Sequence, residues 1–170
     1  MKQLHKATTE ALQQVQQLID ACDRAQYNQP CIHSESGIGR HVRHILDHFL
    51  ALQAGLTDNL IDYNRRHRDS NIENDPEIAS QLVNNLLRWF ADSEDALADK
   101  TIQVESEISI SEEQNMSFES TINRELCYLI NHTIHHVAYA KLVAKNLGVS
   151  LDSTIGIAPS TATYLRQQAS

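Results

Sequence analysis

The sequence contains few glycine, proline and aromatic residues. Of its 170 residues, 5 are Gly and 3 are Pro, and Phe, Trp and Tyr together make up 5%. Because Gly and Pro mark turns and loops, their scarcity favours long helices over a fold of many short strands. With so few aromatic rings, aliphatic side chains must fill most of the core. The length suits a single domain spanning residues 1–170.

The cysteine count excludes a disulfide-based scaffold. Cys22, Cys31 and Cys127 are odd in number and form no Cys-x-x-Cys pair, which indicates a reducing compartment. The residues after Met1 turn polar at once, without the apolar stretch of a signal peptide. No apolar run approaches the ~20 residues that span a bilayer. We therefore expect a cytoplasmic protein that does not contact a membrane.

Positive charge is also scarce. The formal net charge is −8 at pH 7, whereas nucleic-acid binding requires a basic surface. The densest basic run, residues 65–68, lies between Asp62 and Asp69 and is expected to be largely neutralised by them. We expect no nucleic-acid partner.

The spacing of apolar residues predicts four long helices. They are expected over residues 2–26, 38–56, 75–98 and 120–147. Asp75 followed by Pro76 predicts the start of the third helix, Ser120 or Thr121 can cap the fourth, and Gly148 ends it. Helices of this length span roughly 30–40 Å at 1.5 Å per residue. The predicted fold is therefore an all-α four-helix bundle.

The connections carry weaker signals. Residues 27–37 and 58–74 are expected to be a loop and a polar connection. Residues 101–110 alternate between apolar and polar, which is typical of a strand and predicts a short β-hairpin with the stretch 116–118, between the third and fourth helices. A short last helix is expected over residues 161–168.

Six of the nine histidines lie in two short windows, each inside a predicted helix. They are His41, His44 and His48 in the second helix, and His132, His135 and His136 in the fourth. His132 and His136 are four residues apart and project from one helix face, a spacing that lets two imidazoles bind one metal ion. A third ligand from a facing helix would leave a coordination position open, as in catalytic zinc sites.

Alternative interpretations of these histidines remain open. One His pair at this spacing is more often a solvated or hydrogen-bonded feature than a metal site. Two such pairs on two helices of one bundle instead favour a metal site. The apolar periodicity places His41 and His48 nearer the core than His44, and alone would favour His48 as the ligand. A haem bound by two histidines is a rarer alternative.

The sequence resembles the DinB/YfiT-like superfamily along nearly its whole length. The motifs that carry the resemblance are Gly37-Ile38-Gly39-Arg40-His41-Val42-Arg43-His44-Ile45 and His132-x-x-x-His136, followed by Gly148. Three further stretches resemble a bacterial subgroup: Ile61-Asp62-Tyr63-x-x-Arg66-x-Arg68, Arg124-Glu125-Leu126 and Gly156-Ile157-Ala158-Pro159-Ser160-Thr161.

The resemblance implies a four-helix bundle, usually a homodimer, with a divalent metal ion, often nickel or zinc. It places the metal ligands on His44, His132 and His136. His48 is an addition to the family pattern and could act as a base beside the metal. Tyr139 stands where relatives often have Gln, which affects substrate preference.

Some relatives resemble metal-dependent thiol transferases or hydrolases. We therefore expect an enzyme that uses a three-His site to activate a thiol or water, acting on a small molecule such as a low-molecular-weight thiol. The alternative is a non-catalytic dimeric bundle whose histidines are structural or store metal.

Overall fold

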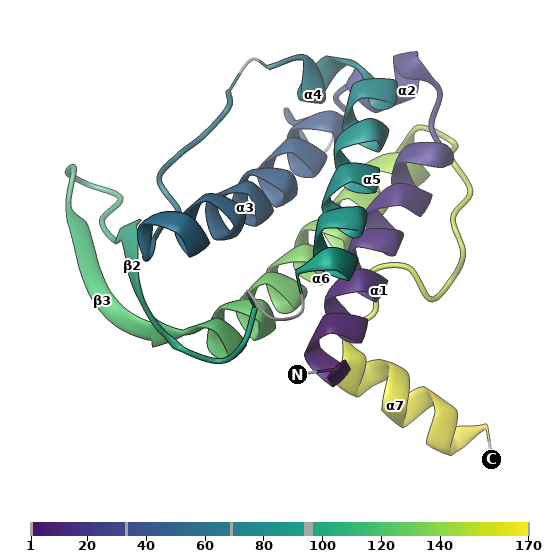
Figure 1. Cartoon of the computed structure of the whole chain (residues 1–170). Helices are drawn as coiled ribbons and strands as arrows, with labels where there is room; N and C mark the ends of the chain where they lie inside the picture. Colours follow the sequence, from purple (N-terminus) through teal and green to yellow (C-terminus); the bar gives the residue numbers. More distant parts are fainter. Residues whose placement is uncertain (1, 33, 69, 94–96, 170) are drawn as a thin grey trace.

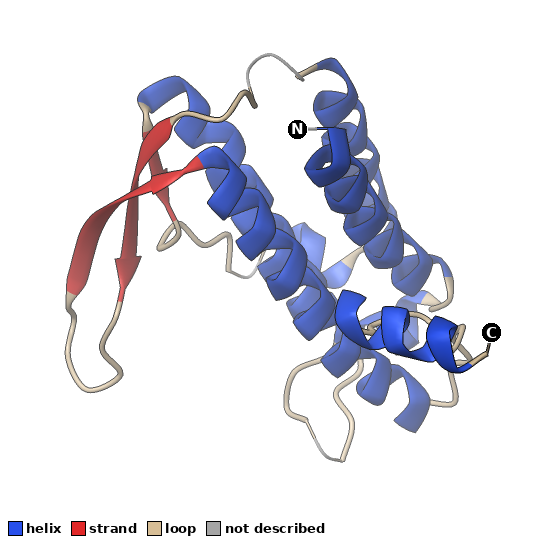
Figure 2. Cartoon of the chain, turned by 90° about the horizontal axis from the view of Figure 1, so that it is seen from below, coloured by secondary structure: helices blue, strands red, loops and turns tan. Residues whose placement is uncertain are grey.

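The computed structural model describes residues 2–32, 34–68, 70–93 and 97–169. Four long helices form its body (Figure 1): α1 (Lys2–Asp20), α3 (Ile38–Asp58), α5 (Pro76–Asp92) and α6 (Ile122–Asn146). Helix α1 contacts α5 and α6, and α3 also contacts α5 and α6. The predicted helical bundle is confirmed, and the helices outnumber the strands clearly when coloured by type (Figure 2).

Aliphatic side chains fill the core, as the shortage of aromatic residues predicts. Among the residues that the structure describes, the largest fully buried side chains include three aromatic rings, those of Tyr27, Phe49 and Phe90, and the others are Leu or Ile. The α3 stripe predicted by periodicity is buried, with Val42, Ile45 and others inaccessible to solvent. Burial of such side chains supplies about 1.5–3 kcal/mol each.

The first predicted helix is divided in two. It ends at Asp20 in α1, and a short helix α2 (Arg24–Asn28) follows after a break. The break arises because Asp23 forms a capping box with Gln26: its carboxylate accepts from the Gln26 backbone N–H, and the Gln26 side chain accepts from the Asp23 N–H. Tyr27 is therefore helical and fully buried, not part of a loop.

The third predicted helix starts as expected and stops early. Asp75 caps α5 by accepting from the Glu77 N–H, and Pro76 is the first helical residue. The helix ends at Asp92, six residues before the predicted end, and residues 94–96 of the predicted extension lie outside the described residues. Leu97 is still buried, so the apolar spacing predicted its burial correctly, although Leu97 lies beyond the end of the helix.

The connection after α3 has more structure than its polar composition indicates. It contains a short strand, β1 (Leu60–Asp62), and a helical turn, α4 (Asn71–Asn74). Asn59, with φ of 58°, ends α3 and turns the chain into β1. Ile61 at the centre of the strand is fully buried, although one apolar pair in a polar stretch gives a weak signal.

The predicted β-hairpin between the third and fourth long helices is present. Strand β2 (Thr101–Glu107) pairs antiparallel with β3 (Asn115–Thr121) and parallel with β1, giving the order β1-β2-β3. Ile102 and Val104 are buried, as alternation predicts. Ile108 and Ile110, however, lie beyond the strand and are exposed, so the predicted end at residue 110 was too late.

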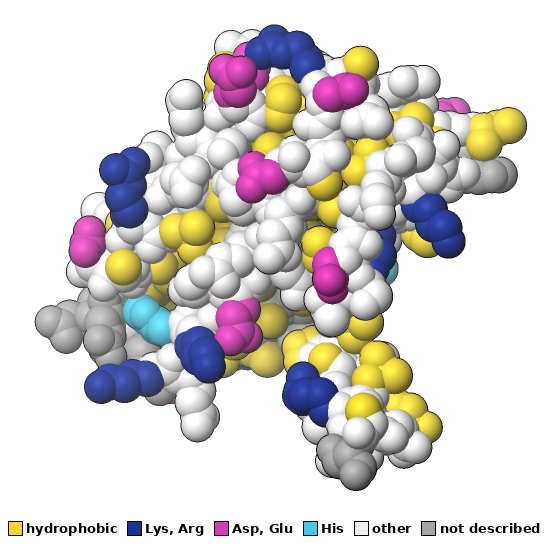
Figure 3. All heavy atoms as spheres, turned by 90° about the vertical axis from the view of Figure 1, so that its right-hand side faces the viewer, with side chains coloured by type: hydrophobic (Ala, Val, Ile, Leu, Met, Phe, Trp, Pro, Cys, Tyr) yellow, Lys and Arg dark blue, Asp and Glu magenta, His cyan; other side chains and the backbone are white. Residues whose placement is uncertain are grey.

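The last long helix ends where the sequence indicates. Thr121 caps α6 by accepting from the Arg124 N–H. At the other end Gly148 has φ of 77°, its N–H donates to the Lys145 carbonyl, and Val149 donates to Ala144, which is the Schellman arrangement. The chain then runs to α7 (Pro159–Gln168), which projects from the bundle with apolar side chains on its surface (Figure 3).

Gly39 provides a test of how the start of α3 is held. A Cβ at this position would come within 2.0 Å of the Glu73 carbonyl oxygen and 2.7 Å of the Tyr27 ring. We expect Gly39→Ala to lower the urea midpoint of unfolding by the equivalent of about 1–3 kcal/mol, because overpacking forces the backbone to shift. The control Gly148→Asn, with open space around the Cβ position and a residue that tolerates positive φ, should change stability by a few tenths of a kcal/mol. Equal stability of the two variants would contradict this packing.

Candidate metal centre

The contact between α3 and α6 brings the two histidine windows together. The His44 ring on α3 lies between His132 and His136 of α6, with ring-centroid distances of 4.9 Å and 4.4 Å. His132 and His136 are 4.5 Å apart on their shared helix face. His135 points away and is exposed, as the helical angle predicts.

The ring nitrogens of these three histidines converge. One nitrogen from each of His44, His132 and His136 lies within 4.8 Å of the other two. The His44 Nε2 and His132 Nε2 atoms are 3.1 Å apart. Zinc binds imidazole nitrogen at about 2.0–2.1 Å, so two nitrogens of a tetrahedral site lie about 3.3 Å apart. The cluster could therefore hold one metal ion after small side-chain rotations.

His41 orients the His136 ring. The two Nδ1 atoms are 3.3 Å apart, so one of them donates a hydrogen bond to the other. If the His136 Nδ1–H is the donor, the His136 Nε2 keeps a free lone pair, which is the arrangement that a metal-binding imidazole needs. This partner fits a metal at His136, and periodicity alone had placed His41 near the core without assigning it a contact.

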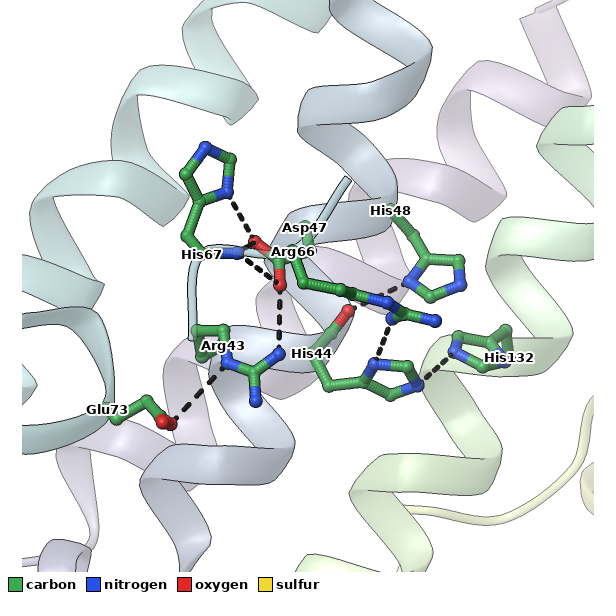
Figure 4. A network of polar contacts seen from close by, with 8 residues as sticks. All are labelled: Arg43, His44, Asp47, His48, Arg66, His67, Glu73 and His132. Carbon is green, nitrogen blue, oxygen red and sulfur yellow. Dashed lines mark hydrogen bonds and ion pairs between the residues drawn. The ribbon is translucent and has the colours of Figure 1, made fainter. Parts of the chain in front are cut away.

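Arg66 contacts the opposite side of the cluster. Its guanidinium donates to the His44 Nδ1 at 2.5 Å (Figure 4). Because a guanidinium cannot accept a hydrogen bond, His44 in this arrangement carries its hydrogen on Nε2 and donates it to the His132 Nε2. Binding a metal through the His44 Nε2 would require that hydrogen to move to Nδ1 and Arg66 to turn aside. The donor set fits a metal, and Arg66 competes with it.

Burial keeps the clustered imidazoles neutral. Desolvation is the main cause in each case, with neighbouring histidines and Arg66 adding to it, and it lowers the pKa of His44 to about 2, of His132 to about 3 and of His136 to about 4. Desolvation also lowers the pKa of His41. Metal ligation needs the neutral imidazole, so all of these side chains are in the required state at neutral pH.

His48 is buried one turn beyond His44. Its Nδ1–H donates to the His44 carbonyl at 2.9 Å, and its ring stacks on Tyr63 at a centroid distance of 5.1 Å. The centroid of the His132 ring lies 4.2 Å from that of His48. Burial lowers the pKa of His48 to about 4, which makes it a weak base. The periodicity that favoured His48 correctly reported its burial, but the converging nitrogens belong to His44 and the two α6 histidines.

A buried carboxylate holds Tyr63 against His48. The Tyr63 hydroxyl donates to Glu125 at 2.7 Å, and Arg124 and Ser120 donate to the other carboxylate oxygen. Glu125 is fully buried, so these three donors offset the cost of removing its charge from water. The arrangement ties β3 and α6 to the residue that follows β1, and it fixes one wall of the site.

A second buried network supports α3 from the opposite side. Asp47 is almost fully buried and accepts from Arg43 at 3.0 Å and from the His67 ring at 2.7 Å (Figure 4). Arg43 also forms an ion pair with Glu73 of α4 at 3.5 Å. These contacts anchor the segment that carries Arg66, and so position the guanidinium over His44.

Arg66 was named only as part of a resemblance motif, and neither its contact with His44 nor the roles of the basic run around it were predicted. Asp62 does pair with Arg65, at 3.4 Å, but Arg66 goes to His44 and His67 to Asp47. Asp69, the other expected neutralising residue, lies outside the described residues. His44 and Arg66 are 22 positions apart, so no local sequence pattern predicts their contact. The Arg43–Asp47 spacing of four was the one visible signal.

Helical bundles often build metal sites from side chains on facing helices, and the three-histidine cluster between α3 and α6 could hold a metal ion. The chain belongs to the DinB family, whose family model matches residues 1–158. A curated relative, "FK506-binding protein 5" of Rhizopus delemar, is 29% identical over 109 residues, which is 64% of this chain. The chain spans about a quarter of that protein, 28% of its length. No solved structure matches.

Among the helices that the structure describes, none combines the length and apolar character required to cross a bilayer. This finding agrees with the charged and polar residues found along each long helix.

Because the clustered histidines are neutral, we expect the metal-free protein to become less stable as the pH is lowered. In the unfolded chain, histidines take up protons below pH ~6.5, whereas the folded cluster stays neutral down to pH about 4 or lower. The unfolded state therefore binds more protons in this window, and stability decreases as pH falls through it. We expect a lower urea midpoint at pH 5 than at pH 7.5 in protein freed of metal. In a His132→Asn/His136→Asn variant the difference should shrink; an unchanged difference would contradict the assignment.

Proposed function

We propose that this protein binds one divalent ion, zinc or nickel, through His44, His132 and His136. The observation that carries the proposal is the convergence of three neutral imidazole nitrogens, from two facing helices, within 4.8 Å. Imidazole suits both zinc and nickel, and three protein ligands leave a coordination position for water or substrate. The His136–His41 hydrogen bond gives additional support, because ligating histidines commonly have such a partner.

We further propose that the protein is an enzyme, a small-thiol transferase or a hydrolase. A metal ion bound at such a site lowers the pKa of water or of a thiol and so supplies a nucleophile near neutral pH. The residues of this chain would bind that ion, exclude water and orient the substrate. His48 is proposed to assist as a base or by positioning His132; its stacking on Tyr63, its ring contact with His132 and its lowered pKa favour positioning.

Metal content tests the first part of the proposal. Protein purified without a histidine tag should carry close to one equivalent of zinc or nickel per chain, because a three-His site retains these ions. The measurement is elemental analysis by mass spectrometry. A content below about a tenth of an equivalent, even after incubation with either metal, would contradict the proposal.

Single substitutions test which histidines bind. His44→Ala, His132→Ala and His136→Ala should each lose metal, since two remaining imidazoles bind far less tightly than three. The matched control is His135→Ala, an exposed neighbour of His136 outside the cluster. If His48→Ala loses metal while His44→Ala retains it, the ligand from α3 is His48 instead.

Arg66 should oppose metal binding. Replacing it by Met removes the donor that holds the His44 hydrogen on Nε2 and also removes a positive charge beside the metal. We expect Arg66→Met to tighten metal binding about tenfold, since hydrogen bonds to charged groups contribute about 1.5–3 kcal/mol. Competition with a chromogenic chelator measures the affinity. Arg65→Met, in the same basic run but paired with Asp62, is the control. Weaker binding by the Arg66 variant than by the control would contradict this role.

The second candidate function is a non-catalytic dimeric bundle. The observation that favours it is α7, which has no buried residue and exposes Tyr164 and Leu165. We propose a homodimer in either case, which size-exclusion chromatography with light scattering would measure. The two functions differ in their response to chelation: thiol-transfer or hydrolytic activity that chelation abolishes and zinc or nickel restores supports the enzyme. Activity unaffected by chelation contradicts a metal mechanism.

A further inference from the structure

A cavity of about 440 Å³ opens beside the histidine cluster, and we refer to it as the arginine cavity. Its lining residues are Ser36, Arg40, His41, Arg43, His44, Arg68, Glu73 and His136. The volume is in the range of small-molecule sites. Because His44 and His136 belong both to the cluster and to the cavity wall, a molecule in the cavity would lie directly against the candidate metal centre.

Three arginines line this cavity, and their charges are not balanced there. Arg43 is largely buried and forms ion pairs with two carboxylates, Asp47 at 3.0 Å and Glu73 at 3.5 Å. Among the residues that the structure describes, Arg40 and Arg68 have no ion-pair partner. Both are exposed and free to turn toward a ligand in the cavity.

The remaining wall residues add one negative charge, that of Glu73, which is engaged with Arg43. His41, His44 and His136 add none, because an imidazole is either neutral or positive near neutral pH. The cavity is thus positive on a chain whose formal net charge is −8. A positive recess on an acidic protein attracts anions selectively, because the surrounding surface repels them.

We propose that the arginine cavity binds an anionic group of a small molecule, a carboxylate or a phosphate, through Arg40 and Arg68. A guanidinium presents paired N–H donors that match two oxygens of either group. The two arginines come from α3 and from the segment before α4, so they approach the cavity from different elements. The part of the ligand beyond its anionic group then reaches His44 and His136.

The identity of this ligand as the substrate rests on the proposed function, whereas anion binding itself does not. If the enzyme proposal is correct, Arg40 and Arg68 select substrates that carry an acidic group at a fixed distance from the reacting atom. A neutral thiol or ester of the same size would be a poor substrate, because two guanidinium groups would remain without a partner.

The test uses tag-free full-length protein that has been stripped of metal and dialysed free of chelator. Inorganic phosphate and succinate are titrated separately, and binding is followed by NMR chemical-shift changes. We expect at least one of them to saturate, and the one that binds more tightly identifies the group as phosphate or carboxylate. Arg40→Gln and Arg68→Gln should each weaken that binding about tenfold, as expected for loss of a charge-assisted hydrogen bond.

The matched control is Arg88→Gln, which removes the same charge from α5, outside the cavity lining. It should leave anion affinity within about twofold. Saturation by neither anion, or equal weakening by Arg88→Gln, would overturn the proposal. Metal content, measured on the same proteins before the metal is stripped, separates the two proposals. Protein that binds metal but no anion refutes the arginine cavity alone. Protein that binds an anion but no metal refutes the metal site alone.

Discussion

Packing of α3 against α6 determines where every histidine of the candidate centre lies. The two helices contact each other and contribute buried aliphatic side chains to one core cluster, including Val42 and Ile45 of α3 and Leu129 and Val137 of α6. Imidazoles one turn apart on each helix are thereby held close together in a partly desolvated layer, with the His44 ring edge-on to the rings of His132 and His136. Desolvation keeps them neutral, and neutrality lets the five imidazole rings of His41, His44, His48, His132 and His136 approach without repulsion. The site is therefore a consequence of ordinary bundle packing.

Two buried carboxylates stabilise this layer from outside. Glu125 holds Tyr63 against His48, and Asp47 holds the segment that places Arg66 over His44. Both carboxylates are buried with several donors, so removing a donor would reduce the compensation of a charge held in a low-dielectric interior. The strand-containing connection after α3, which adds β1 to the hairpin, thus serves to position the walls of the centre as well as to connect two helices.

The helices and their ends could be predicted because their signals are local. Asp75-Pro76 starts α5 and Gly148 ends α6, as helix capping requires. The break after Asp20 was missed, although the Asp23–Gln26 capping box that causes it is also local. Resemblance to the DinB family, now confirmed by the family match, led to His44, which periodicity alone ranked below His48. Tyr63 and Arg66 belong to a motif that carries the subgroup resemblance, but their contacts with His48 and His44 could not be predicted, because these depend on long-range chain paths and not on neighbouring residues.

The central claim is that His44, His132 and His136 together bind one metal ion. A crystal structure of zinc- or nickel-loaded, tag-free protein, with anomalous data collected at the absorption edge of that metal, tests it most directly. We predict one anomalous peak per chain, about 2.0–2.1 Å from a ring nitrogen of each of these three histidines, with Arg66 turned away from His44. A peak on other residues, or none at the α3–α6 contact, would contradict the account.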